Sequence, residues 1–283
     1  MILPRFTFLG TGTSGGVPQI ACDCEVCTST DPRDTRSRTG AAIEWTDPTG
    51  RDRLVLIDTT PDLRQQALRH KLQRCDAIVF THNHVDHIFG LDEVRRFNAA
   101  MQAPIDVFAD RETMESLRRV YRHIFEKEKN QNSSFVATLI AHEIEPERSF
   151  DLYGMRFTPI PLLHGRQPIL GYRIEKVKTE TVSPESPLPL AYCTDVSGIP
   201  PQTWPYLTGL RTLVLDGLRL RHHPTHFNLA QAVDHALQIG AGQTWLVHIA
   251  HEILHAREEA NLPQGISLAW DGLVLGEGAE VPR

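Results

Sequence analysis

The sequence contains no apolar run that approaches the roughly 18 residues of a membrane-spanning helix, so a transmembrane segment is not expected. Its N-terminus also lacks the basic stretch, the long apolar stretch and the small-residue cleavage site of a secretory signal. We interpret Arg5–Leu9 as a first strand instead. These absences favour a cytoplasmic protein that makes no membrane contact.

Basic residues are scarce relative to acidic ones, because 29 Lys and Arg against 35 Asp and Glu leave a formal net charge of −6. Proteins that follow long nucleic acids along the phosphates usually carry a basic surface. We therefore expect no long nucleic-acid partner. The 283 residues, 41% hydrophobic and 23% charged, are enough to bury a core, and we expect one domain over residues 1–283. The sequence leaves a homodimer open.

Cysteine is also scarce, and the five residues are an odd number that does not favour a disulfide framework in a cytosolic chain. Cys22, Cys24 and Cys27 form a C-x-C-x-x-C cluster, which is typical of a zinc site but lacks the usual fourth ligand. Cys75 and Cys193 are interpreted as small buried apolar residues.

Strand and helix patterns alternate along the chain. We expect strands at Arg5–Leu9, Ala41–Trp45, Arg53–Ile57, Ala77–Thr81, Arg156–Leu163, Leu170–Glu175, Leu190–Cys193, Thr212–Leu215 and Thr244–Val247. Helices are expected from Thr60 to about His70 and at Leu91–Met101, Arg111–Phe125 and Leu229–Ile239. The polar stretch Glu126–Ser134 is interpreted as a mobile loop, and Lys176–Pro189 as a surface excursion. The order of elements fits an α/β (α+β) protein with a four-layer αββα sandwich of two mixed sheets.

A glycine-rich segment, Gly10-Thr-Gly12-Thr-Ser-Gly15, matches the G-x-G-x-x-G pattern of dinucleotide-binding turns. No amphipathic helix follows it, since Val17-Pro18 and the cysteine cluster come next. Without a helix N-terminus for a pyrophosphate, we favour a tight loop close to the functional site over a nucleotide site.

The segment Thr81-His82-Asn83-His84-Val85-Asp86-His87 follows an apolar strand and has the form H-x-H-x-D-H. Four metal-capable side chains in six residues are hard to explain as core filling, and they predict a metal centre. Alternate residues face two ions in this hypothesis, His82 and His84 one ion, Asp86 and His87 its neighbour.

Three further candidate ligands, His164, Asp195 and His248, each come at the end of an expected strand. Functional residues of α/β scaffolds favour this placement. Asp195 is the carboxylate placed to bridge both ions, with a water between metals about 3.5 to 4 Å apart.

Taken together, these residues resemble the metallo-β-lactamase superfamily, whose H-x-H-x-D-H motif and later His, Asp and His ligands match this sequence. The chain looks most like the branch of the phosphoribosyl 1,2-cyclic phosphate phosphodiesterase of phosphonate breakdown. That resemblance rests on Gly10-Thr-Gly12 with Gly16-Val-Pro18, on Cys22-Asp-Cys24-Glu-Val-Cys27, on Asp195-Val-Ser-Gly198-Ile-Pro200 and on His248-Ile-Ala-His251. It implies the metallo-β-lactamase sandwich fold. Glu112–Ile144 and Lys176–Pro189 look longer than in that branch, which leaves the exact substrate open.

The resemblance also implies two sets of active-site ligands and a structural zinc. One divalent ion, Zn or Mn, would be held by His82, His84, His164 and Asp195, and a second by Asp86, His87, His248 and Asp195. His251 would complete a structural zinc site with Cys22, Cys24 and Cys27.

Several residues near these motifs are further candidates. His226 matches the family's catalytic histidine that is not a ligand, and we count it with Asp86 and Asp195 as catalytic. Asp58, at the end of a strand, is expected to orient a ligand histidine. Arg95 and Asn98, about one helical turn apart, are candidates for facing substrate.

Other charged residues are given no role in the site. Arg33, Arg36 and Arg38 form a basic run, interpreted either as a phosphate contact or as a solvated loop. The remaining histidines are expected at the surface, namely His70, His123, His142, His235 and His255.

These observations predict a metal-dependent phosphodiesterase that hydrolyses a small phosphodiester, cyclic on a sugar or nucleoside, with hydroxide held by two ions and His226 as general acid. A ribonuclease Z-like tRNA-processing nuclease shares the metal loop but needs an RNA-binding surface that the charge balance does not favour. A thioester or lactam hydrolase would use the same ligands. A noncatalytic accessory metalloprotein of the quinone-cofactor biosynthesis type is the remaining alternative, although a decayed site would be expected to lose ligands.

Overall fold

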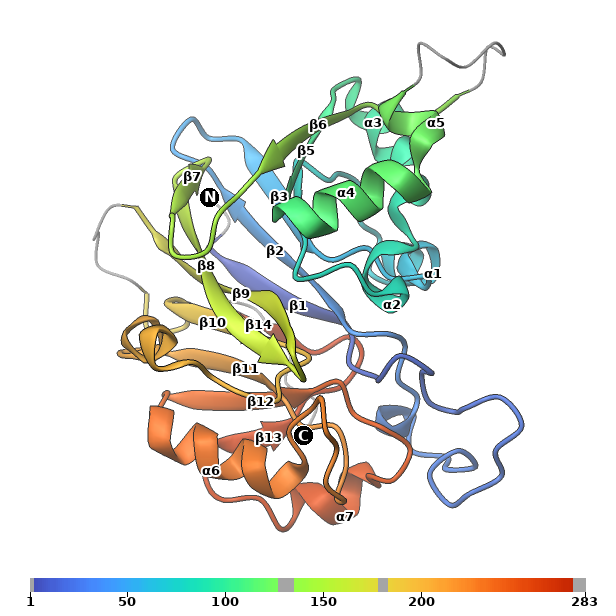
Figure 1. The fold of residues 1–283 in the computed structure, drawn as a ribbon, viewed down its shortest axis with the longest axis vertical. Helices are drawn as coiled ribbons and strands as arrows, with labels where there is room; N and C mark the ends of the chain where they lie inside the picture. The colour runs from blue at the N-terminus through green and yellow to red at the C-terminus, as the bar shows by residue number, and fades with distance from the viewer. Residues whose placement is uncertain (1–2, 127–134, 178–182, 277–283) are drawn as a thin grey trace.

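The computed structural model describes residues 3–126, 135–177 and 183–276, and these form two sheets packed face to face with helices on both outer sides (Figure 1). The first sheet has the order β14-β1-β2-β3-β4-β5-β6 and the second has the order β13-β12-β11-β10-β9-β8-β7. This is the expected four-layer αββα sandwich of two mixed sheets.

The first sheet is mainly built from the first half of the chain. Its strands in sheet order are β14 (Val274–Leu275), β1 (Arg5–Gly10), β2 (Gly40–Thr46), β3 (Asp52–Ile57), β4 (Ala77–Val79), β5 (Ile105–Ala109) and β6 (Leu139–Glu143). The strands β3 to β6 are parallel to one another, so their carboxyl ends lie at the same edge of the sheet.

The second sheet contains the second half of the chain. Its strands in sheet order are β13 (Ile266–Leu268), β12 (Gln243–Val247), β11 (Thr212–Asp216), β10 (Leu190–Cys193), β9 (Gln167–Lys176), β8 (Met155–His164) and β7 (Phe150–Leu152). The strands β10 to β13 are parallel. Because β9 is antiparallel to both β10 and β8, β8 ends at the same edge as the parallel strands.

Helices cover the outer faces, together with short 3-10 segments. The helices are α1 (Leu63–Arg69), α2 (Val85–Ile88), α3 (Arg95–Met101), α4 (Arg111–Val120), α5 (Arg122–Phe125), α6 (Leu229–Ile239) and α7 (His255–Glu259). The 3-10 segments are Pro32–Asp34, Leu91–Val94 and Pro201–Leu207. No helix in the described part of the chain is long and apolar enough to cross a membrane.

Three apolar clusters hold the layers together. Phe6, Phe8, Tyr172 and Tyr192 belong to the cluster between the two sheets. A second cluster lies under α1 to α5 on the first sheet, and a third lies under α6 on the second. Burial of apolar surface on both faces of each sheet explains why the strands read as nearly continuous apolar runs.

Three of the four expected helices begin or divide differently in the structure. The helix expected from Thr60 begins at Leu63, because the Thr60 carbonyl and hydroxyl cap the turn that precedes it. The helix expected at Leu91–Met101 is a 3-10 turn followed by α3, and the one expected at Arg111–Phe125 divides at Tyr121. Asp110 caps α4 as its N-cap, with its carboxylate accepting from the Thr113 amide.

The two expected loops lie partly outside the described residues, which omit 127–134 and 178–182. In the described part of the second loop, Ser186 and Leu188 are buried, and Leu188 belongs to the cluster between the sheets. The end of this segment is therefore part of the core and not a surface excursion, because the chain must return to the sheet at β10.

Candidate metal centre

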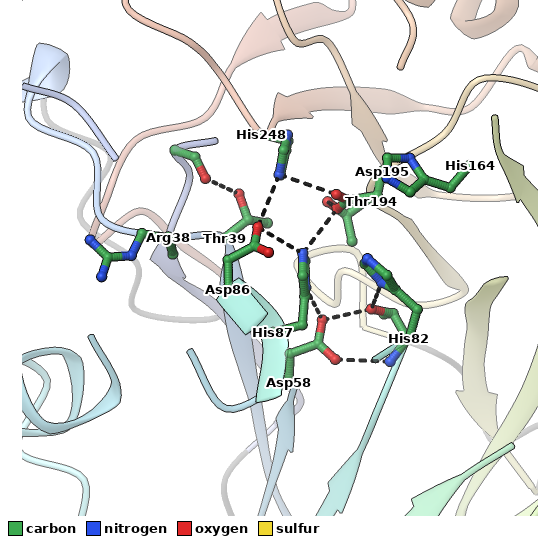
Figure 2. Close-up of polar contacts among 12 residues, drawn as sticks. Arg38, Thr39, Asp58, His82, Asp86, His87, His164, Thr194, Asp195 and His248 are labelled. Atoms are coloured by element: carbon green, nitrogen blue, oxygen red, sulfur yellow. Dashed lines mark hydrogen bonds and ion pairs between the residues drawn. The ribbon is translucent and has the colours of Figure 1, made fainter. Parts of the chain in front are cut away.

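The expected ligands meet at the edge where the parallel strands of both sheets end. His82, His84, Asp86 and His87 follow β4, and His164 ends β8. Asp195 comes two residues after β10, and His248 directly follows β12. We call this group of seven residues the strand-end cluster, and Figure 2 labels all of them except His84.

Two groups of ligand atoms can be distinguished within the strand-end cluster. Those of His82, His84 and His164 lie within 4.8 Å of one another, and so do those of Asp86, His87, Asp195 and His248. Asp195 is also within this distance of His164. The structure therefore brings together all the residues that the sequence assigns to two ions, with Asp195 between the two groups.

Asp195 makes close contacts on both of its oxygens. Its Oδ2 atom lies 3.3 Å from His87 Nε2, and its Oδ1 atom lies 3.2 Å from His248 Nε2. The Thr194 hydroxyl donates to Oδ2 at 2.6 Å. Burial pushes the pKa of Asp195 upward, but His248 and His87 hold it well below its usual range. The carboxylate is thus ionised, as a metal ligand must be.

Four buried ring nitrogens of the cluster make no hydrogen bond to the described residues, namely Nε2 of His82, Nε2 of His87 and both ring nitrogens of His248. The Nε2 atoms of His87 and His248 face carboxylate oxygens at 3.2 to 3.6 Å. Buried polar atoms are normally satisfied, and a cation shared between these nitrogens and the carboxylates would satisfy both. Imidazole and carboxylate donors in this number fit two divalent ions such as Zn²⁺ or Mn²⁺.

Neighbouring groups orient most of the histidines. Asp58 Oδ2 lies 2.7 Å from His87 Nδ1, and the Thr81 hydroxyl lies 3.0 Å from His82 Nδ1. The Thr225 carbonyl accepts from His164 Nδ1 at 2.7 Å. Such contacts set the ring orientation and leave the Nε2 atom free to bind a cation. Asp58 therefore occupies the position that the sequence analysis expects for it.

Three of the residues at the strand ends adopt a strained backbone. The φ angles of Asp58, Asp195 and His248 are +63°, +60° and +62°. A left-handed conformation is unfavourable for residues other than glycine, and it persists where the surrounding structure imposes it. These turns redirect the chain at the sheet edge so that the side chains face the cluster.

His226 lies beside the strand-end cluster without belonging to either group of expected ligands. Its ring centre is 4.5 Å from that of His164 and 4.7 Å from that of His248. Burial, followed by the charge of His248, lowers the pKa of His226 to about 3. The ring is thus held neutral in the protein as described.

Asp216, at the end of β11, orients His226 and was not identified in the sequence. Its Oδ2 atom lies 2.6 Å from His226 Nδ1 and accepts from the Val196 amide at 2.7 Å. Burial raises the pKa of Asp216 well above its usual range, although the charge of His248 acts to lower this pKa. The only sequence signal is an acidic residue at the end of an apolar strand, the same signal that marks Asp195.

The cysteine cluster forms beside this site, from a loop before β2 and a turn after β12. The Sγ atoms of Cys22, Cys24 and Cys27 lie 3.3, 3.4 and 3.6 Å from His251 Nδ1. All three thiols are free. The amide of Cys27 is the main cause that lowers the pKa of Cys24 to about 6. Three thiols around one imidazole fit a tetrahedral zinc ion.

The glycine-rich segment packs closely against the chain and opens no helix. Gly12 forms isolated parallel β-bridges with Arg38 and with Ile249, and its amide donates to the Ser37 carbonyl at 2.8 Å. A Cβ atom at Gly12 would lie 2.7 Å from the Arg36 carbonyl oxygen. The glycine is needed for this close approach, next to the turn that carries His248.

The side chain of Asn98 binds the backbone, and its expected role toward substrate stays a prediction. Its amide donates to the carbonyls of Ala103 and Thr138 and accepts from the Thr138 amide, so its polar atoms bind the backbone. Arg95 forms an ion pair with Asp92 at 2.9 Å, and its role toward substrate stays a prediction.

Two residues expected at the surface are buried. Arg36 is 1% exposed, so the basic run is neither a solvated loop nor a phosphate contact at this position. His255 is also 1% exposed. Cys75 and Cys193 are buried, as expected.

A comparison with known families decides the classification of this chain. Residues 53–249 match the model of the beta-lactamase superfamily domain. The chain belongs to this superfamily. It is 34% identical over 271 residues to the octanoyltransferase of Porphyromonas gingivalis, which covers 95% of this chain and 51% of that protein. The chain thus spans about half the length of the curated relatives it matches.

Among solved structures, a new diphosphatase from the PhnP family is similar over 98% of both chains, with a TM-score of 0.83 and 39% identity. Zn²⁺-bound PqqB from Methylobacterium extorquens covers 96% of this chain and 99% of its own, with a TM-score of 0.73 and 19% identity. Both likenesses confirm the expected metallo-β-lactamase sandwich. The likeness to the PhnP-family diphosphatase also confirms the expected resemblance to the phosphodiesterase branch of the superfamily.

Proposed function

We propose that this superfamily member is a metal-dependent phosphodiesterase that hydrolyses a small, cyclic sugar or nucleoside phosphodiester. The observation that carries the proposal is the convergence of two groups of ligand atoms on Asp195, beside a histidine that is oriented but not needed as a ligand. Two divalent cations bound there would lower the pKa of a shared water and neutralise charge on the phosphoryl oxygens.

The roles of the chain's own residues follow from their positions. His82, His84 and His164 would hold one cation, Asp86, His87 and His248 the other, and Asp195 both. Asp58 and Thr81 keep two of these rings oriented before any ligand arrives. Because the residues are buried and already aligned, little reorganisation is required when the substrate binds.

His226 is proposed to supply the proton that the leaving oxygen needs. Its Nδ1 atom shares a hydrogen with Asp216, which directs Nε2 toward His164 and Asp195. When water oxygen bonds to phosphorus and the opposite P–O bond breaks, the leaving alkoxide would take a proton from Nε2. Asp216 is the positioning residue for this step, and the phosphate anion favours the protonated ring.

Charge supports a small substrate over a long nucleic acid. The net charge is −6, and binding of long RNA would require several Lys or Arg contacts to phosphates. A small cyclic phosphodiester requires the two ions, His226 and one or two further donors. Two alternative substrates follow from the similar proteins. The likeness to the diphosphatase, at 39% identity, suggests a phosphoanhydride as the nearest alternative. The likeness to the octanoyltransferase suggests a thioester.

The free thiols of the cysteine cluster favour a reducing compartment, so we propose that the protein acts in the cytoplasm.

The experiment that tests the proposal compares substrates on one preparation loaded with Zn²⁺ or Mn²⁺, with metal counted per chain. The panel contains bis(p-nitrophenyl) phosphate, a nucleoside 2′,3′-cyclic phosphate, a nucleoside diphosphate, an octanoyl thioester and a precursor tRNA. We expect the highest kcat/KM on the cyclic phosphate, with weak dependence on salt. Faster hydrolysis of the thioester, or specific processing of the tRNA, would contradict the proposal.

A further inference from the structure

A buried ion pair joins the two metal-capable clusters, although it belongs to neither. Arg36 and Asp34 have side-chain exposures of 0% and 1%, and Arg36 Nη2 lies 2.7 Å from Asp34 Oδ1. Arginine is among the residue types that are almost never fully buried unless they are paired. The other contacts of this pair therefore indicate what it holds in place.

The Arg36 guanidinium binds the turn that carries His251. It donates from Nη1 to the Ala250 carbonyl at 3.2 Å and from Nη2 to the Ile253 carbonyl at 2.9 Å. These two carbonyls lie on either side of His251 in the chain. The third nitrogen, Nε, donates to the Arg33 carbonyl at 3.1 Å.

Asp34 contacts both the segment after His251 and the loop that carries the cysteines. Its Oδ1 atom also accepts from the His255 amide at 2.8 Å, at the start of α7. Its Oδ2 atom accepts from the Ser29 hydroxyl at 2.7 Å, two residues after Cys27. The pair thus connects the end of the cysteine-bearing loop to the segment 248–255 without any metal.

The segment 248–255 also positions His248, which depends on its backbone more than His82, His87 and His164 do. His87, His82 and His164 each have a partner on Nδ1. Both ring nitrogens of His248 lack a hydrogen bond to the described residues. Its orientation therefore rests on a left-handed backbone conformation at φ +62°, two residues before a carbonyl that Arg36 holds.

We propose that Asp34 and Arg36 form a positioning pair that holds His248 and His251 on one preordered turn and so couples the strand-end cluster to the cysteine cluster. When the pair is intact, a cation at either cluster binds a turn that is already ordered. When it is lost, each cation must order the turn itself, and its affinity falls. The proposal rests on the metal-binding part of the proposed function, and it does not depend on the substrate.

The coupling has a direct thermodynamic consequence. If zinc in the cysteine cluster favours the ordered turn, it strengthens cation binding at the strand-end cluster, and the reverse holds by the same factor. A pair that only fills the core would change the stability of the protein and leave both metal affinities unchanged.

The test uses Arg36→Lys, which keeps the positive charge but cannot reach four acceptors at once. The matched control is Arg53→Lys. Arg53 forms ion pairs with Asp47 and Asp76 at 2.7 and 2.9 Å near the start of β3, at the end of that strand away from the clusters. Cation affinities at both clusters are measured by competition with chelators, on variants whose fold is verified by circular dichroism.

We expect Arg36→Lys to weaken cation binding at the strand-end cluster by about 10-fold or more, within the range seen when residues behind metal ligands are changed. Loss of activity at limiting metal should be largely restored at saturating metal. Arg53→Lys should leave both affinities unchanged. Equal losses of thermal stability in the two variants, with metal affinities unchanged in both, would overturn the proposal.

Asp34→Asn serves as the second variant if Arg36→Lys does not fold. It keeps an oxygen acceptor for the guanidinium and the His255 amide but removes the charge. We expect a smaller loss of metal affinity in the same direction, and an unchanged affinity would overturn the proposal. These experiments measure metal affinities, so they test the positioning pair even if every phosphodiester assay fails. Such a failure would count only against the proposed substrate.

Discussion

The strand-end cluster and the cysteine cluster share one turn of the chain but are held together in different ways. Most residues of the first are buried at the edge of two sheets, and hydrogen bonds from Asp58, Thr81 and Thr225 orient three of its rings. The cysteine cluster comes from a loop, and its four residues are partly exposed. Its thiols mainly contact one another and His251.

This difference indicates what a cation would contribute at each place. At the strand-end cluster the fold has already aligned the donors, so a cation would serve chemistry and its removal should leave the sandwich intact. At the cysteine cluster the three thiols come from a partly exposed loop and converge on one imidazole, so a zinc ion would contribute to stability directly.

The strongest way to break the strand-end cluster is Asp195→Ala. Because Asp195 contacts His87 and His248 and lies between the two groups of ligand atoms, both cations should be weakened. We expect hydrolysis to fall by on the order of 10⁴-fold, as for other residues on which a whole constellation depends. Metal content per chain, measured together with kcat/KM, checks this. Full activity with an unchanged metal count would refute the bridging role.

His226→Ala separates proton transfer from metal binding within the same region. We expect turnover to fall by roughly 10²- to 10⁴-fold while metal content is retained, since His226 is not needed by either ligand group. A substrate that releases p-nitrophenolate should lose much less, because this leaving group needs no proton. Equal losses on good and poor leaving groups would assign His226 to shaping the site.

Asp216→Asn should reproduce the pattern more weakly, because it changes the partner of Nδ1 and keeps the His226 ring.

Asp58→Asn tests whether the strand-end cluster is aligned in advance. The amide keeps the shape but no longer offers a carboxylate to His87 Nδ1 and the Thr81 hydroxyl. Changes of this kind behind a metal ligand lower affinity by about 10- to 100-fold. Chelator competition measures the effect, and the melting temperature at saturating metal serves as the control. An affinity equal to that of the wild type would mean that the backbone alone orients His87.

Cys24→Ser is the matching change at the cysteine cluster. We expect loss of one tightly held zinc and a fall in melting temperature of on the order of 5 °C, since a few kcal/mol shift a chain of this size by that amount. Cys75→Ser is the control thiol, because Cys75 is buried away from any ligand group. If Cys24→Ser keeps both its zinc and its melting temperature, the cysteine cluster does not hold a structural ion.

A smaller effect of pH should appear at the shared turn, through His255. Burial, followed by the charges of Arg33 and Arg36, lowers the pKa of His255 to about 4. In the unfolded chain the value is near 6.5, so between these values only the unfolded state takes up the proton. The stability due to this group is therefore present above about pH 6.5 and is lost as pH falls toward 4.

Between pH 7 and pH 5 the expected loss for His255 is about 1 to 2 kcal/mol. Urea unfolding of metal-free protein, with His255→Gln as reference, isolates the contribution, because the other histidines titrate in both proteins. The variant should show a weaker decrease in stability over this range. Identical pH dependence in the two proteins would contradict the assignment.

Local patterns were enough to predict the residues of the strand-end cluster. The His82–His87 segment is dense in metal-capable side chains, and His164, Asp195 and His248 each end an apolar strand. Since parallel strands end at one edge of a sheet, such residues meet in space although they are far apart in the chain. The alternation of elements fits the sandwich, and the resemblance to the superfamily singles it out. The short strands β5, β6, β7, β13 and β14 lack enough periodicity to be recognised.

Residues whose environment depends on distant partners could not be predicted in this way. Arg36 is buried because carbonyls 214 and 217 residues away satisfy its donors, and no local pattern records that. The same reason explains His255, whose amide binds Asp34 across 221 residues. Asp216 carries the same signal as Asp195, but only the fold shows that His226 lies beside it.

The pairing of β14 with β1 bears on how the protein must be synthesised. Phe6 and Thr7 lie opposite Leu275 and Val274, and the Phe8 carbonyl accepts from the Gly272 amide. During translation the chain up to Leu275 must therefore leave the ribosome before this edge of β1 is covered. Until then, β1 offers an open strand edge to other chains, which is a known route to aggregation. Cells that make this protein thus have a reason to protect its N-terminal half until the last strand arrives.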